Sequence, residues 1–148
     1  MNRRIWLPVT LLAIAFAAGV LPEEHPRPAL SLGGYRVLAA DFHVHPGFLA
    51  AGAVAPWDLE MLARRQGLDV LAVTPHNQIY SARIARWFFR RLGGPTIIAG
   101  EEIRTLPYHL VAIGIEHRIA PQGTAAEVID AIHAQGGVAI AAHPFNRF

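Results

Sequence analysis

Histidine and carboxylate side chains recur along this 148-residue chain, and the first group is Asp41-Phe42-His43-Val44-His45. It ends an apolar run that is predicted to be a buried strand, bounded by Gly33-Gly34 and Pro46-Gly47. Residues two apart on a strand point to the same side, so His43 and His45 project together and Asp41 joins them. Two converging neutral imidazoles are suited to bind Zn, Fe, Mn or similar cations. A single His-x-His is as consistent with an inert pair, so the rest of the chain must decide.

Four of the expected strands each have a side chain that can bind a metal at or just after the strand's C-terminal end. The strands are expected at about 36–45, 69–74, 96–99 and 138–142, and these side chains are His43 and His45, His76, Glu102, and His143. Helices are expected between them at 56–66, 79–92 and 124–135, where Thr124 and Glu127 form a capping box. This alternation predicts a parallel α/β architecture. Since active sites of α/β barrels lie at the C-terminal ends of the strands, we expect these side chains to gather at one rim.

The remaining histidines are weaker candidates for metal binding. His109 stands at the start of a further expected strand, 108–115, rather than at its end. His25, His117 and His133 are expected to be ordinary surface histidines, in a linker, a loop and a helix respectively. Asp41 is expected to orient a ligand histidine, and Glu101 to be a charged neighbour of Glu102.

The N-terminal segment has the layout of a targeting sequence. Basic Arg3-Arg4 precede an uncharged stretch from Ile5 to Leu21, and a proline-rich stretch follows. This predicts a signal peptide or an uncleaved membrane anchor over residues 1–21, a linker over 22–34 and the functional domain over 35–148. Either form of the leader implies an exported domain, periplasmic or extracellular, that contacts a membrane only through the N-terminal segment.

Charge and cysteine content exclude several classes of site. Residues 22–148 contain 11 arginines, no lysine and 11 acidic residues, so no basic surface for nucleic acid is inferred. The stripe formed by Arg83, Arg86 and Arg90 is expected to be a solvated helix face. The chain has no cysteine, which excludes disulfides and thiolate ligands. Any metal must therefore be held by histidines and carboxylates.

These motifs resemble the polymerase-and-histidinol-phosphatase (PHP) family of metal-dependent phosphoesterases, from about Val37 to the end of the chain. The matching motifs are Asp41 to His45, Thr74-Pro75-His76-Asn77, Gly100-Glu101-Glu102, His109 to Gly114 and His143-Pro144. The resemblance implies a distorted (β/α)7-type barrel with two or three divalent ions, Mn, Fe or Zn, and Glu102 as the bridging ligand. The implied metal ligands are His43, His45, His76, Glu102, His109 and His143, and all of them except His109 are also expected to be catalytic.

Three departures from the family pattern qualify the resemblance. Pro75 stands where the family has aspartate, and the loop after His45 lacks an early Asp or His. The family's final Asp-x-His has no counterpart before Phe148. We therefore expect a barrel that is incomplete at its C-terminus, and a chain that is a portion of a longer protein.

The expected function is hydrolysis of a small phosphorylated substrate by metal-activated water. Arg104 and Arg147 are expected to hold the non-reacting phosphate oxygens, although a surface role suits them equally well. Three alternatives stay open at this point. One is a metal hydrolase of the amidohydrolase or TatD-nuclease kind. Another is a catalytically decayed metal-binding module, which Pro75 and the missing C-terminal Asp-x-His favour. The third is that this chain does not fold alone.

Overall fold

The computed structural model describes residues 7–14, 27–47, 54–92 and 94–145. Residues 7–14 form a short helix. The named elements that follow are β1 (Leu30–Leu32), β2 (Tyr35–Val37), β3 (Ala40–Val44), α2 (Pro56–Arg65), β4 (Val70–Val73), α3 (Tyr80–Leu92), β5 (Thr96–Arg104), β6 (His109–Ile113), α4 (Ala125–His133) and β7 (Val138–Ala141). Within the described ranges, no helix is long and apolar enough to cross a membrane. Most of the expected leader, together with His25 and Arg147, lies outside the described residues.

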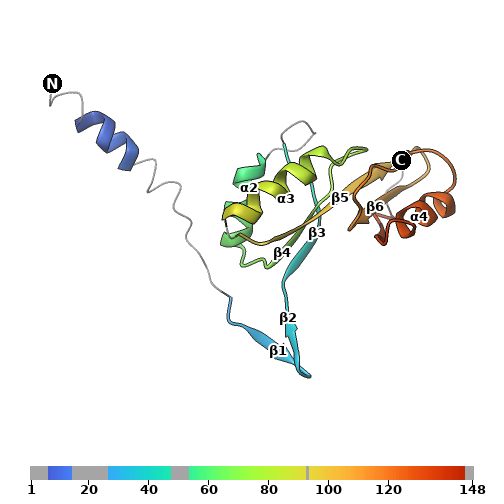
Figure 1. Cartoon of the computed structure of the whole chain (residues 1–148), viewed down its shortest axis with the longest axis horizontal. Coiled ribbons are helices and arrows are strands. Elements are labelled where there is room, and N and C mark those ends of the chain that lie inside the picture. Colours follow the sequence, from blue (N-terminus) through green and yellow to red (C-terminus); the bar gives the residue numbers. More distant parts are fainter. Residues whose placement is uncertain (1–6, 15–26, 48–53, 93, 146–148) are drawn as a thin grey trace.

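The main sheet has five strands in the order β3-β4-β5-β6-β7. β3, β4 and β5 are parallel to one another, whereas β6 is antiparallel to both β5 and β7. Figure 1 shows this sheet curling between a pair of helices, α2 and α3, and the more distant α4. The molecule is thus a mixed α/β structure with a curled half-barrel sheet.

The expectation of an all-parallel sheet is wrong for β6. Only residues 105–108 separate β5 from β6, and a parallel crossover needs about a dozen residues or more. The chain therefore turns back as a hairpin, in which Thr105 closes the turn on the carbonyl of Tyr108. Pairing with β6 also extends β5 to Arg104, so Glu102 lies inside this strand and not beyond its end.

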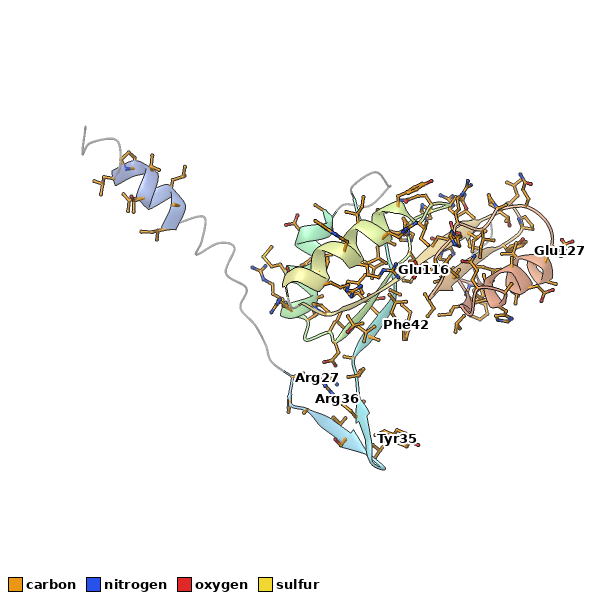
Figure 2. The ribbon with its side chains drawn as sticks, in the orientation of Figure 1. Arg27, Tyr35, Arg36, Phe42, Glu116 and Glu127 are labelled. Atoms are coloured by element: carbon orange, nitrogen blue, oxygen red, sulfur yellow. The ribbon has the colours of Figure 1, made fainter. Side chains whose placement is uncertain are left out.

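The single strand expected over residues 36–45 is divided into β2 and β3. β2 pairs with β1, which lies within the segment expected as a linker. Gly33 and Gly34 connect these two strands with φ values of 57° and 83°, a two-residue turn that suits glycine. The β1–β2 hairpin projects away from the main sheet (Figure 1), and Tyr35 lies near its tip (Figure 2).

Asp69 connects this hairpin to the start of β4. Its carboxylate accepts hydrogen bonds from the Arg27 guanidinium at 2.6 Å and from the backbone N–H of Ala39 at 2.8 Å. These contacts fix the chain just before β3, and so they fix the strand that carries His43.

The helices pack on the sheet through small and apolar side chains. α3 lies on β5 with Ala82, Ala85 and Phe89 buried, and these join a core that includes Val73 and Ile103. The predicted capping box at the start of α4 is confirmed, since Thr124 accepts from the Glu127 N–H and Glu127 accepts from the Thr124 N–H. α4 packs beside β7 and buries Val128 and Ile132.

Candidate metal centre

The carboxylate of Glu102 is the centre of the site and is 1% exposed. Five imidazole nitrogens surround its two oxygens. On one side, Oε2 lies 3.1 Å from His43 Nε2, 3.0 Å from His45 Nε2 and 2.8 Å from His76 Nε2. On the other side, Oε1 lies 2.8 Å from His109 Nδ1 and 3.0 Å from His143 Nε2. All six residues expected to be metal ligands are therefore brought together.

The reversal of β6 explains why His109 belongs to this group. The first residue of an antiparallel strand lies at the edge of the sheet where its parallel neighbours end. His109 starts β6 opposite Arg104, two residues beyond Glu102 on β5. Ranking His109 lower because it stands at a strand's start was based on the wrong strand direction.

β7 delivers His143 to the same edge, since it is antiparallel to β6 and so runs in the direction of β5. The backbone N–H of Ala142 donates to the carbonyl of His109 at 3.1 Å, which holds the end of β7 beside the start of β6. His143 itself adopts a φ of 31°, in the left-handed region that non-glycine residues seldom occupy. Backbone strain of this kind is often found at functional sites.

Two residues to which the sequence analysis assigned no role position His43, His45 and His76. The hydroxyl of buried Thr74 accepts a hydrogen bond from the backbone N–H of Val44 and donates one to the Val44 carbonyl. Val44 is the residue between His43 and His45. Asn77 adopts a φ of 47°, and its side chain accepts from the Arg104 N–H at 2.8 Å. Its own N–H donates to the carbonyl of Glu102 at 2.9 Å. The sequence signal for Asn77 was its type, because asparagine tolerates the left-handed conformation better than most residues.

The electrostatics of the centre favour an ionised carboxylate at Glu102 and neutral imidazoles at His45 and His76. Burial would raise the pKa of Glu102, but the hydrogen bond from His43 and the charge of His76 outweigh it and lower the pKa to about 2. Burial lowers the pKa of both His45 and His76. Neutral imidazoles keep a lone pair available, and this is the form that binds metals.

The donor set fits divalent cations. His43 Nε2 and His45 Nε2 lie 2.9 Å apart, so both ring nitrogens face the same small region of the site. The ligand atoms of His43, His45 and Glu102 lie within 4.8 Å of one another, and so do those of Glu102, His109 and His143. Glu102 is shared by both groups, with a different oxygen closest to each. One carboxylate between two imidazole groups is suited to bridge two cations.

Glu101 points away from this centre. It is fully buried, and its Oε1 accepts a hydrogen bond from the backbone N–H of Ile119 at 2.5 Å. Its Oε2 has no hydrogen-bond partner among the described residues. Burial raises the pKa of Glu101 to about 6. Alternation along β5 thus separates two adjacent glutamates, one toward the imidazoles and one toward the loop before α4.

The other candidate residues lie around the centre. Arg104 is exposed, and its charge contributes to the lowered pKa of His76, which follows mainly from burial. Asp41 accepts a hydrogen bond from the backbone N–H of His43 at 3.0 Å. His117 and His133 are exposed.

No family model matches the chain, but the chain is similar to other known proteins. The chain is 27% identical over 119 residues to the uncharacterized protein MJ1587 of Methanocaldococcus jannaschii, covering 74% of this chain and 69% of that protein. It is also similar to a crystal structure from Bacteroides vulgatus, a two-domain protein containing a predicted PHP-like metal-dependent phosphoesterase. The TM-score is 0.71 with 25% identity.

The structural neighbour is PHP-like. The similarity covers 83% of this chain but only 40% of the neighbour. The half-barrel sheet and the His/Glu cluster are consistent with a PHP-like fold, and the cluster could bind metal.

Proposed function

We propose that this chain carries the metal centre of a PHP-type phosphoesterase that hydrolyses esters of phosphoric acid. The observation that carries the proposal is the position of the Glu102 carboxylate, whose two oxygens face separate groups of imidazoles. The similarity to a predicted PHP-like phosphoesterase supports the reaction class.

In this proposal His43, His45, His76 and Glu102 hold one divalent cation, and Glu102, His109 and His143 hold another. Mn, Fe and Zn all suit imidazole and carboxylate ligands. When bound, such cations would lower the pKa of a water molecule and polarise the phosphate. A third cation would need further ligands.

The chain's own residues would position the substrate. The side chains of His43, His45, His76 and His143 are 25–34% exposed, whereas Glu102 and His109 are buried beneath them. A phosphate ester would thus approach from the exposed side of these four histidines. The negative charge of the buried Glu102 carboxylate would keep the phosphate from moving deeper into the site. Arg104, held through its backbone by Asn77, is the proposed contact to a non-reacting phosphate oxygen.

The test is metal analysis followed by assays on a phosphomonoester, a phosphodiester, an amide and single-stranded DNA, each with Mn, Fe or Zn. We expect metal-dependent hydrolysis of a phosphate ester that is lost in Glu102→Gln and retained in the exposed control His117→Ala. Hydrolysis of the amide alone would instead favour an amidohydrolase-type enzyme. Tight metal binding without turnover of any substrate would contradict the phosphoesterase proposal while leaving the metal centre intact.

A further inference from the structure

The outward-facing side of α3 carries exposed arginines together with large apolar side chains, unlike the histidines and glutamate of the metal centre. α3 contains four arginines and no acidic residue. Tyr80, Arg83, Ile84, Trp87 and Arg90 are all exposed and recur at helical spacing, and we call them the α3 outer face.

The large apolar groups of this face are substantially exposed to solvent. Tyr80 is 66% exposed, Ile84 44% and Trp87 58%. The opposite side of the helix buries the smaller Ala82 and Ala85 together with Phe89. The outer side of α3 thus combines apolar and cationic groups, the two kinds of group that bind the surface of an anionic membrane.

The arginines on the α3 outer face, and Arg86 beside it, keep a positive excess. Arg86 donates two hydrogen bonds to Glu116, at 2.7 and 2.8 Å, and these bonds raise the pKa of Arg86. The charge of Arg83 also acts on Glu116 and helps to lower its pKa. The single carboxylate of Glu116 therefore interacts with both Arg83 and Arg86, and Arg90 adds a third positive charge on the same helix. Arg83, Arg86, Trp87 and Arg90 line an open hollow of about 590 Å³.

We propose that the α3 outer face docks on the surface of an anionic phospholipid bilayer. Trp87 and Tyr80 would lie at the level of the headgroups, Ile84 would reach the acyl boundary, and the arginines would contact lipid phosphates. This contact is additional to the N-terminal segment, to which the sequence analysis confined any membrane contact.

Two observations favour a bilayer over nucleic acid as the partner. α3 carries four arginines and no acidic residue, while residues 22–148 as a whole carry equal numbers of arginines and acidic residues, so no extended track for a phosphate backbone is expected. Residues 7–14 form a second exposed helix of apolar character, with Leu7, Val9, Leu11, Leu12 and Ile14 each more than half exposed. Apolar surface on both segments suits a lipid partner.

The absence of cysteine from the sequence allows a site-specific test on the full chain. An environment-sensitive fluorophore is attached to Ile84→Cys on the α3 outer face, or to Val138→Cys on β7 as the control. Both positions carry exposed aliphatic side chains, 44% and 55% exposed. The labelled proteins are titrated with vesicles of phosphatidylcholine alone, or of equal parts phosphatidylcholine and phosphatidylglycerol.

We expect a blue-shifted emission for the label at position 84 with the anionic vesicles only, and no shift for the label at position 138. Arg83→Gln and Arg90→Gln should each weaken this response about fivefold, whereas Arg36→Gln on the β1–β2 hairpin should not. The N-terminal segment could itself bring the protein to vesicles, but this would not embed position 84.

Three outcomes would overturn the proposal. The label at position 84 could remain in an aqueous environment on vesicles that bind the protein. It could respond equally to both kinds of vesicle. It could also respond to a DNA oligonucleotide, or to rising protein concentration without lipid, which would assign the face to nucleic acid or to a second copy of the chain.

Discussion

Glu102 is the residue on which the whole centre depends, because it is the only carboxylate among five imidazoles in the described cluster. Replacement by glutamine keeps the size of the side chain but removes the charge and one of the two ligand oxygens. We expect Glu102→Gln to lower metal affinity by at least about 100-fold, because even residues that only orient ligands contribute 10- to 100-fold. Metal content after dialysis measures this, and Glu101→Gln is the matched control that should retain metal. Equal metal content in the two variants would contradict the assignment of Glu102 as a ligand.

Glu101, its neighbour, predicts a pH dependence of stability. Its pKa is raised to about 6 in the folded state, mainly by burial, so ionisation opposes folding. The stability contributed by the protonated group is fully present below the ordinary pKa of about 4.5 and is lost as pH rises to about 6. Glu101→Gln should therefore be more stable than the wild type by about 2 kcal/mol above this range and nearly equal to it below. Urea denaturation of the metal-free proteins at several pH values measures the difference. A constant difference at all pH values would indicate another cause, such as altered packing around Ile119.

At the scale of elements, the connection from β4 to α3 carries His76 and is held to β5 by Asn77. The side chain of Asn77 accepts from the Arg104 N–H, and its backbone donates to the carbonyl of Glu102. Asn77→Gly keeps the left-handed conformation but loses the side-chain hydrogen bond, and should cost about 1 kcal/mol. Asn77→Ala loses both and should cost about 2–3 kcal/mol.

Both Asn77 variants should also bind metal about tenfold more weakly, since His76 would no longer be held against Glu102. Urea denaturation and metal titration measure the two effects separately. Wild-type metal affinity in Asn77→Gly would show that the backbone contacts alone position His76.

Gly100 shows how closely the hairpin of β5 and β6 is packed beside the centre. A Cβ atom at this position would lie 2.2 Å from the carbonyl oxygen of Ala112 and 3.2 Å from Thr74. Glycine is therefore required here for the strand approach, two residues before Glu102. The Gly-x-Glu spacing, used in the sequence analysis as a motif, has this steric basis.

At the scale of the molecule, the proposed cations connect segments from His43 to His143. Since the unfolded chain cannot assemble these ligands, metal binding should stabilise the folded state, by about 2.7 kcal/mol at a free metal concentration 100 times Kd. For a chain of this length we expect a rise in melting temperature of about 5–10 °C. Calorimetry with and without a chelator measures the shift, and Glu102→Gln should show none. An equal shift in that variant would place the stabilising ion elsewhere.

Much of the site was predictable because metal ligands are restricted to a few residue types. Without cysteine or lysine in the chain, His and Glu at strand ends were the candidates. Periodicity along one strand predicted that His43 and His45 project together, and the ends of two further strands predicted that His76 and His143 join them; all four side chains lie beside Glu102. The positioning roles of Thr74 and Asn77 were missed because these residues act through backbone groups of residues distant in sequence, and such contacts leave little local pattern.

The sequence by itself determined which side chains could form the centre and that strands ending at one edge would bring them together. Only the tertiary structure decided the direction of β6, the position of Glu102 within β5 and the opposite environments of Glu101 and Glu102. The physical reason is that hydrophobic periodicity is the same for parallel and antiparallel strands, whereas their direction depends on how the chain returns to the sheet. That return brings His109 to Glu102, and with it the second group of imidazoles.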